Sequence, residues 1–237
     1  MSAHVGIVGC SAEGASLCYR TLCIDAAQLM GPHAHPEVSM HTFSLSQYVP
    51  CLEQADWQGV ANLMLGSARK LAAAGAEFLI CPDNTIHQAL PRVLPQSPLP
   101  WLHIAEVVAQ VAAERGFRRL GLTGTRWLVG SEVYPEKLRV RGIEYLRPTD
   151  PERDAINRII MDELVRGIFS AEALSYFQQV MRRMKSAGCD AVVLGCTEIP
   201  LIMNDSNSPL PTLDSTRLLA RAALRRAVST AGNGQLG

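Results

Sequence analysis

The sequence has no excess of charge, no long apolar run and no paired cysteine motif, and each absence removes a class of function. Lys and Arg number 22 and Asp and Glu number 22, so the net charge is zero. A chain without a basic surplus is a poor partner for nucleic acid or an anionic membrane surface. No apolar stretch reaches the roughly 18 residues of a membrane span, and the first residues lack the pattern of an export signal. We therefore expect a cytoplasmic protein that acts on small molecules, without nucleic-acid or membrane partners.

The seven cysteines are irregularly spaced and include no C-x-x-C pair. An odd number without paired spacing fits neither a disulfide framework nor a structural zinc site, so we expect free thiols. His33 and His35 could offer two metal ligands, but no acidic cluster accompanies them and a solvated loop is favoured. The sequence thus predicts no metal site.

Lysine is scarce, and this bears on cofactors. Lys70 and Lys185 are expected on amphipathic helices with a solvated role, which leaves Lys137 as the candidate for a pyridoxal Schiff base. Its segment has no other feature of a phosphate site. The glycines of residues 6–14 lack the spacing of a dinucleotide fingerprint. We therefore predict that no cofactor is bound.

Apolar strands and helices alternate along the chain. Buried strands are expected at residues 5–9, 78–81, 101–103, 119–123 and 191–194. Helices are expected from the first strand to Leu29, at 57–74, at 104–115, from Asp150 through an apolar stripe ending at Ile168, and at 215–228. Strands that are apolar throughout and alternate with helices are typical of parallel sheets covered on both faces. The predicted fold class is α/β.

An internal repeat divides the chain into similar halves. The matching segments are residues 5–9 with 120–124, 70–85 with 183–198, and 100–109 with 211–220. We predict two pseudo-symmetric α/β domains, residues 1–103 with 212–237 and residues 104–211, so that the last helix returns to the first domain. Ligands of such sheets collect at the carboxyl ends of the strands, which predicts an active site in the cleft between the domains.

The repeat places Asp83 and Cys196 at equivalent positions, each just after a buried strand where a helix is expected to begin. Unpaired N–H groups at a helix start stabilise a thiolate, which makes Cys196 a candidate base or nucleophile. The other cysteines are expected to be small buried apolar side chains. Asn84, Thr85 and Thr197 bring hydrogen-bonding groups to the same edge, and such an edge suits an anionic small substrate.

Three motifs carry a resemblance to a known family. They are the run from Val192 to Pro200 with its Gly-Cys-Thr-Glu, the block from Asn84 to His87, and Leu122-Thr-Gly-Thr125 followed by Tyr134. Over nearly its whole length the sequence resembles the aspartate/glutamate racemase superfamily, and its aspartate racemase branch in particular. The resemblance implies a cofactor-independent, homodimeric enzyme in which two cysteines on opposite faces of the substrate's α-carbon remove and return its proton.

The chain departs from the family pattern at the first cysteine. The position immediately before Asn-Thr-x-His holds Asp83, while Cys81 lies two residues earlier, before Pro82. We therefore predict a catalytic dyad of Asp83 and Cys196. To act as an acid near pH 7, Asp83 needs a pKa raised by burial or by a nearby negative charge. The loop at residues 9–14 also lacks the Gly-Gly-Met of typical aspartate racemases.

Two further side chains have open roles. His87 is either a partner of the site residues or part of the first turn of an ordinary helix. Glu198 is either a catalytic acid or a carboxylate at a helix start. The predicted substrate-binding residues are Ser11, Asn84, Thr85, Thr125, Thr197 and Glu198.

The predicted function is racemisation of a small acidic amino acid such as aspartate or glutamate. Two alternatives remain: a decarboxylase or isomerase of a related dicarboxylic acid, and a binding protein that kept the substrate clamp and lost half of the dyad. An ionisable group in place of the first cysteine, together with the intact Gly-Cys-Thr-Glu context, favours the enzyme.

Overall fold

Two four-stranded parallel sheets form the framework of the computed structural model, which describes the backbone of residues 2–232 and the side chains of residues 2–229. The strand orders are β2-β1-β3-β4 and β6-β5-β7-β8, so both sheets have the same topology. The strands are β1 (Val5–Gly9), β2 (Val38–Thr42), β3 (Phe78–Ile80), β4 (Trp101–Leu102), β5 (Arg119–Thr123), β6 (Glu144–Leu146), β7 (Ala191–Leu194) and β8 (Thr212–Asp214). The predicted α/β class with two similar parallel-sheet domains is confirmed.

The described residues form two compact units. Unit 1 contains the chain up to Ile104 and from Thr216 onward, and unit 2 contains Ala105–Ser215. The helices of unit 1 are α1 (Ala12–Met30), α2 (Leu45–Glu53), α3 (Trp57–Ala73), α4 (Leu90–Val93) and α10 (Ser215–Gly232). Those of unit 2 are α5 (Ile104–Glu114), α6 (Arg126–Val129), α7 (Val133–Arg139), α8 (Asp150–Asp162) and α9 (Ala171–Ser186).

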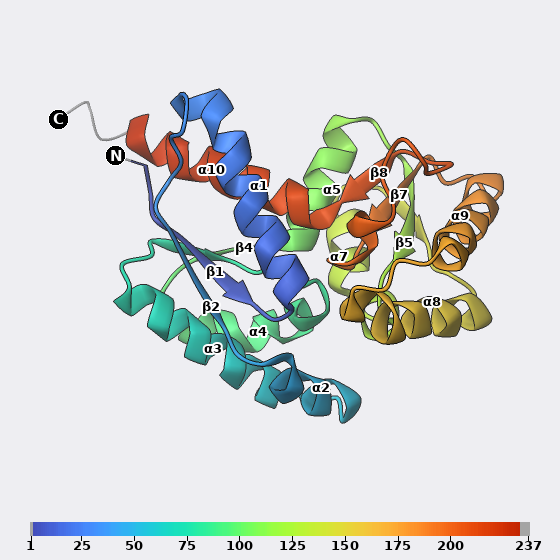
Figure 1. The fold of residues 1–237 in the computed structure, drawn as a ribbon, viewed down its shortest axis with the longest axis horizontal. Coiled ribbons are helices and arrows are strands. Elements are labelled where there is room, and N and C mark those ends of the chain that lie inside the picture. The colour runs from blue at the N-terminus through green and yellow to red at the C-terminus, as the bar shows by residue number, and fades with distance from the viewer. Residues whose placement is uncertain (1, 233–237) are drawn as a thin grey trace. The chain divides into compact units, whose positions relative to one another are not determined.

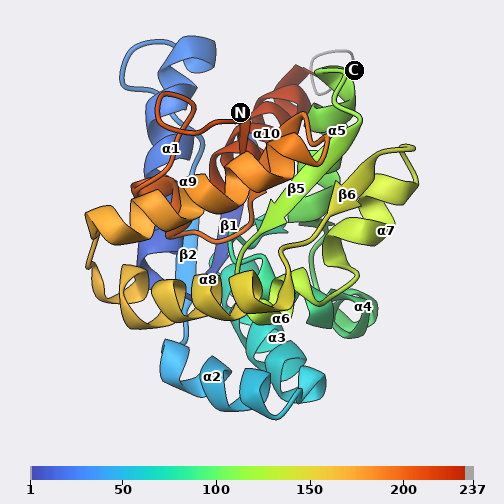
Figure 2. The ribbon, with the colours of Figure 1, turned by 90° about the vertical axis from the view of Figure 1, so that its right-hand side faces the viewer.

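Helices cover both faces of each sheet, as the apolar character of the strands requires. In unit 1, α1 and α10 lie on one face and α3 on the other (Figure 1). In unit 2, α8 and α9 lie together on one face and α7 on the other (Figure 2). Every residue of β1, β3 and β7 is buried. These inner strands therefore fix the backbone positions from which the candidate site residues extend.

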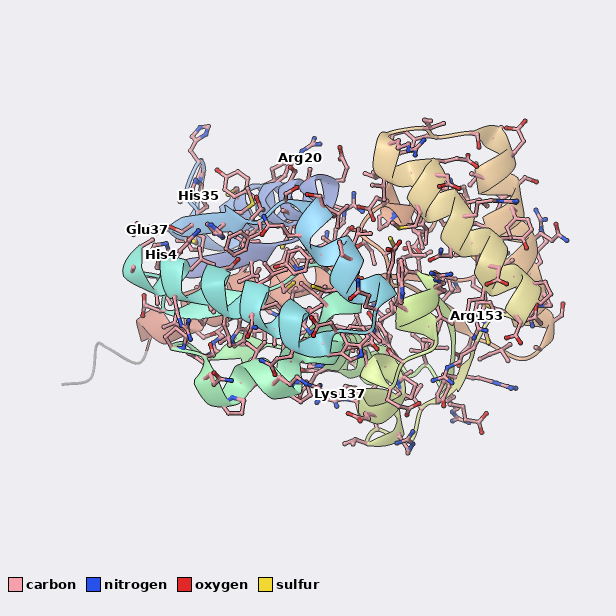
Figure 3. The ribbon with its side chains drawn as sticks, turned by 90° about the horizontal axis from the view of Figure 1, so that it is seen from below. His4, Arg20, His35, Glu37, Lys137 and Arg153 are labelled. Carbon is pink, nitrogen blue, oxygen red and sulfur yellow. The ribbon has the colours of Figure 1, made fainter. Side chains whose placement is uncertain are left out.

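The same hydrogen bond joins the amino ends of the inner strands in both units. The backbone N–H of His4 donates to Glu77 Oε1 at 2.8 Å, and that of Arg119 donates to Asp190 Oδ1 at 3.1 Å. The His4 ring also lies 3.7 Å from Glu37, and Figure 3 shows the two side chains close together. Structural polar contacts thus occupy the amino ends of the strands.

Several local predictions are corrected. The helix that begins at Asp150 ends at Asp162, and Ile168 is half exposed because Gly167, in the left-handed region at φ 72°, turns the chain toward α9. The helix expected after β7 is a 3-10 turn at Ile199–Leu201, and the one after β3 begins as a 3-10 turn at Thr85–Ala89. No helix within residues 2–232 is both long and apolar enough to span a bilayer.

Candidate functional site

The predicted site residues lie at the carboxyl ends of the two inner strands of each sheet. The chain leaves β1 toward β2 and leaves β3 toward β4, in opposite directions along the first sheet, and β5 and β7 repeat this arrangement in the second sheet. Such a switch point opens a crevice between diverging loops, where α/β sheets bind ligands. Each unit therefore has one edge, formed by the carboxyl ends of its two inner strands, at which its candidate site residues lie.

In unit 1 the edge combines the loops after β1 and β3. Ser11 is the N-cap of α1 and accepts the backbone N–H of Gly14 at 3.3 Å. The Asp83 carboxylate accepts the N–H of Thr85 at 3.1 Å. Asn84 and Thr85 are buried, whereas Asp83 is half-buried. Asp83 is thus an anchored carboxylate that keeps some access to solvent.

Cys81 and His87 support this loop from within. The Cys81 thiol is fully buried and lies 3.7 Å from the backbone oxygen of Asp83. Burial, and then the Asp83 charge, raise the pKa of Cys81 well above its ordinary value, so it stays a thiol. His87 Nε2 donates to the backbone oxygen of Cys81 at 3.1 Å, and its ring packs edge-to-face on His103. His87 therefore holds the loop that carries Asp83.

Sequence reasoning missed Tyr48, on α2. Its side chain is fully buried, and this burial raises its pKa far above the ordinary range, while the Ser67 hydroxyl opposes the shift. The phenol is therefore neutral. The available signal was weak, because Pro50 interrupts the helical pattern of the segment.

In unit 2 the loops after β5 and β7 approach closely at two glycines. Gly195 donates its N–H to the backbone oxygen of Thr123 at 3.0 Å, and a Cβ on Gly195 would lie 2.4 Å from that oxygen. Gly124 has a φ of 146°, and a Cβ added to it would lie 2.9 Å from the backbone oxygen of Gly195. Thr125 follows as the N-cap of α6 and accepts the N–H of Leu128 at 3.3 Å. Only glycine at position 195 allows this approach of the two strand ends.

The Cys196 thiol and the Glu198 carboxylate are direct partners. Cys196 Sγ donates to Glu198 Oε2 at 2.8 Å, and the Thr197 hydroxyl donates to the same oxygen at 2.7 Å. All three side chains are buried, with exposed fractions of 7%, 3% and 3% along the chain. The three-residue 3-10 turn that follows has no helix macrodipole of consequence, so the expected stabilisation of a Cys196 thiolate by a helix is wrong. A buried carboxylate stands beside the thiol instead and can accept its proton.

A buried phenol also stands at this second edge. Tyr134, on α7, is buried, and burial followed by the Asp214 charge raise its pKa far above the ordinary range, while the Ser215 hydroxyl opposes the shift. The Ser215 hydroxyl in turn donates to the backbone oxygen of Leu194 at 2.8 Å. The Ser215 hydroxyl is thereby fixed at the end of β7.

The residues weighed for metals and cofactors occupy other surroundings. Among residues 2–232 no group of three or more His, Cys, Asp or Glu side chains could hold a metal ion. His33 and His35 are exposed in a turn region. Lys137 lies on α7 with its ammonium 3.8 Å from Glu106 of α5, and it is labelled in Figure 3. The cysteines within the described residues are free thiols, as predicted.

Comparison with known proteins places these features in a family context. A sequence model of the Asp/Glu/Hydantoin racemase family matches residues 7–223. A crystal structure from Yersinia pestis, named only provisionally as an Asp/Glu racemase, is 30% identical with a TM-score of 0.86, covering 95% of this chain and 99% of that one. An aspartate racemase homologue from Pyrococcus horikoshii OT3 is 26% identical with a TM-score of 0.82, covering 96% and 100%. A broad specificity amino-acid racemase from Bacillus subtilis (strain 168) is 23% identical over 172 residues, which are 71% of this chain and 73% of that protein.

Proposed function

Because the chain belongs to the Asp/Glu/Hydantoin racemase family, we propose that it racemises a small acidic amino acid by proton transfer at the α-carbon with Asp83 and Cys196. The family confirms the predicted enzyme class, a racemase that acts on amino acids. The substrate and the two transferring groups are the new part of the proposal. The predicted domains, residues 1–103 with 212–237 and residues 104–211, each supply one of these groups.

The contact between Cys196 and Glu198 carries the proposal. A cysteine acts as a base only in its thiolate form. The Glu198 carboxylate, 2.8 Å from the Cys196 sulfur, can accept the thiol proton, and a cysteine that only fills space does not need such a partner. Before Cys196 removes the α-proton, Glu198 can accept the thiol proton and pass it to solvent while Asp83 takes one up, so that this direction begins with Cys196 as thiolate and Asp83 protonated. The proposed role of Glu198 is thus to accept the proton of the Cys196 thiol. This role is more specific than the two that the sequence left open, a catalytic acid or a carboxylate at a helix start.

Asp83 is the proposed partner on the opposite face of the α-carbon. It follows β3 at the position that Cys196 occupies after β7, and its carboxylate is held by the N–H of Thr85. In one direction the Asp83 carboxylate removes the α-proton and the Cys196 thiol supplies a proton to the other face. In the reverse direction Cys196 is the thiolate and Asp83 carries the proton, so charge and protons balance in both.

The polar groups at the two edges suit a dipolar amino acid. We propose that Ser11, Asn84, Thr85, Thr125 and Thr197 orient the substrate's carboxylate and ammonium groups through hydrogen bonds. The proposed enzyme needs no cofactor, and in keeping with its family resemblance we propose a cytoplasmic homodimer. Light scattering that gives a monomer mass would contradict the dimer alone.

The test is racemisation of single enantiomers of aspartate and glutamate, followed by optical rotation. The wild-type protein is expected to bring at least one of these amino acids to an equal mixture of enantiomers after dialysis against a chelator. Cys196→Ala is expected to lose turnover. Cys189→Ala is the matched control, because Cys189 is also buried in unit 2 but precedes the amino end of β7. Equal activity in both variants would refute the role of Cys196, and decarboxylation in place of racemisation would favour the alternative reaction.

A further inference from the structure

A small cavity opens between α1 and α10, the two helices that cover one face of the first sheet (Figure 1). Its volume is about 230 Å³, and it is lined by five residues of α1 and two of α10. All of these residues belong to unit 1, and none of them is a predicted site residue. The proposed racemisation therefore leaves this cavity without a role.

Positive charge is concentrated on the wall of the cavity. Arg20 of α1 lines it together with Arg217 and Arg221 of α10. Among the residues that the structure describes, Asp25 is the one acidic residue of this wall, although basic and acidic residues are equal in number over the whole chain. Arg217 and Arg221 are four residues apart on α10, a spacing at which like charges repel. An anion bound between them would relieve this repulsion.

The ion pair at the wall shows the kind of group that these arginines bind. Arg221 Nε donates to Asp25 Oδ2 at 2.6 Å. A guanidinium group carries five N–H donors, so Arg221 keeps donors for a second oxyanion. The Arg20 guanidinium, labelled in Figure 3, forms no hydrogen bond or ion pair with any residue in the described part of the chain. Donors for an oxyanion are thus present on both helices.

The volume of the cavity and its apolar side chains limit the ligand. At about 230 Å³ the cavity is smaller than the roughly 300–1,000 Å³ of pockets that hold drug-sized ligands, which argues for a ligand smaller than a nucleotide. Leu17 and Ile24 of α1 add two aliphatic side chains to the lining. A ligand with two negative charges and few carbon atoms fits both the charge and the volume.

We propose that the cavity between α1 and α10 binds a small dianion, either phosphate or a short dicarboxylate, through Arg20, Arg217 and Arg221. A planar guanidinium group pairs two N–H donors with two oxygens of a carboxylate or a phosphate, so both ligands offer the same chemistry. The proposal goes beyond the proposed function and does not depend on it, because no lining residue takes part in the proton transfer. A ligand that binds only the folded chain also stabilises it by mass action.

The test titrates the full chain with inorganic phosphate and, separately, with succinate at constant ionic strength. The arginine Nε–H signals are followed by NMR, and those of Arg20 and Arg217 are assigned from their loss in Arg20→Gln and Arg217→Gln. At least one of the two anions is expected to shift both wild-type signals along a saturating curve. Each variant is expected to weaken binding at the remaining arginine by at least about tenfold, because it loses a charge-assisted hydrogen bond. A saturating anion is also expected to raise the urea midpoint of wild type more than that of Arg20→Gln.

Arg225→Gln is the matched control, because Arg225 is exposed on α10 and lies outside the lining. It removes the same charge and is expected to keep the wild-type affinity. Tighter binding of phosphate would support a phosphate ligand, and tighter binding of succinate would support a dicarboxylate. Shifts that never saturate with either anion, or an equal loss of affinity in Arg225→Gln and Arg20→Gln, would overturn the proposal, because they indicate only a general attraction to a positive surface.

Discussion

The two candidate carboxylates differ in their surroundings, and the difference gives them different tasks. Asp83 is half-buried and accepts a backbone N–H, whereas Glu198 is buried and accepts the Cys196 thiol and the Thr197 hydroxyl. An accessible carboxylate can meet a substrate directly. A buried carboxylate bonded to a thiol acts through that thiol. We therefore propose Asp83 as the group that transfers the proton and Glu198 as the group that acts through Cys196.

Substitution of Glu198 tests this assignment. Glu198→Gln keeps the size of the side chain and an oxygen acceptor but cannot take the thiol proton. Exchange at the Cys196 face is expected to fall by at least about 100-fold, as for loss of a proton-transfer partner. Exchange at the Asp83 face is expected to change much less. Solvent deuterium uptake into single enantiomers measures both, and unchanged uptake at the Cys196 face would show that the carboxylate is only structural.

At the scale of elements, the ends of β5 and β7 determine where the Cys196 loop lies. Gly195 bonds to Thr123 across the sheet and leaves no room for a side chain toward that backbone oxygen. The backbone hydrogen bond between Gly195 and Thr123 and their close approach therefore fix the position of the Cys196 loop. A change at Gly195 must move the thiol.

Gly195→Ala is expected to cost about 1–3 kcal/mol of unfolding free energy, because the added methyl group overpacks the site. Turnover is expected to fall by far more than the unfolded fraction explains, since a displacement of about 1 Å can cost about 100-fold. Urea unfolding and steady-state rates measure the two effects. Gly130→Ala is the milder control, because its added Cβ would lie 3.2 Å from the oxygen of Arg126. Wild-type turnover in Gly195→Ala would show that the close approach is dispensable.

The start of α8 offers a test that does not involve the candidate site. The Glu152 carboxylate accepts a hydrogen bond from the backbone N–H of Thr149 at 2.7 Å. Both of its oxygens also accept hydrogen bonds from the Arg183 guanidinium at 2.6 Å. Burial raises the pKa of Glu152, but the bonds from Arg183 and Thr149 outweigh it and the net pKa is lowered. The folded state therefore binds the proton less tightly than the unfolded state, and Glu152 stabilises the fold above its ordinary pKa.

Glu152→Gln is expected to lower the unfolding free energy by about 1 kcal/mol at pH 7, the typical cost of a lost cap. The difference from wild type is expected to shrink as the pH falls below about 4.5, where the unfolded carboxylate gains its proton. Urea unfolding at pH 7 and pH 3 measures it. Glu144→Gln is the control, since Glu144 is exposed and forms only a surface ion pair with Arg119, at 3.7 Å, which contributes little to stability. A difference that persists unchanged at pH 3 would contradict the electrostatic account.

At the scale of the whole molecule, α10 completes unit 1 from the far end of the chain. The N–H of Ala3 donates to the backbone oxygen of Ala227 at 2.9 Å, and Arg221 pairs with Asp25 of α1 at 2.6 Å. Leu219 is fully buried on this helix. Unit 1 therefore depends on α10, which begins more than a hundred residues after β4, the last strand of its sheet.

Leu219→Ala is expected to lower the unfolding free energy by about 2–5 kcal/mol, the range for a large aliphatic side chain lost from a core. Arg225→Ala, at an exposed position of the same helix, is expected to stay within about 0.5 kcal/mol of wild type. Urea unfolding followed by tryptophan fluorescence measures both. Equal effects of the two substitutions would mean that α10 is not part of the core of unit 1.

The sequence predicted the repeated framework because its signals are local and strong. The match of residues 70–85 with 183–198 falls on α3 and β3 in one unit and α9 and β7 in the other. The edge strand β2 and helix α2 were missed because their residues are largely exposed or half-buried and Pro50 breaks the helical pattern. Tyr48 was missed with α2, since its burial arises from tertiary packing.

The candidate site residues follow the strands after which the sequence predicted them, but their local geometry differs from the prediction. The motif containing Cys196 predicted the family, which the comparisons confirm. The helix expected after it is replaced by a short 3-10 turn, because the polar turn residues from Asn204 to Ser208 end the segment through side-chain bonds to their own backbone. The dyad of Asp83 and Cys196 stays a prediction.

The central claim is that two unlike groups serve opposite faces of one α-carbon, and deuterium uptake from single enantiomers tests it most directly. Each enantiomer of aspartate and glutamate is incubated in deuterated solvent with wild type, Asp83→Asn or Cys196→Ala, and α-deuterium is measured in the remaining substrate and in the product. Wild type is expected to deuterate the product of both directions. Each variant is expected to lose racemisation and to exchange one enantiomer only, and the two variants are expected to spare opposite enantiomers. Full racemisation by Asp83→Asn, or no α-exchange by wild type, would contradict the account.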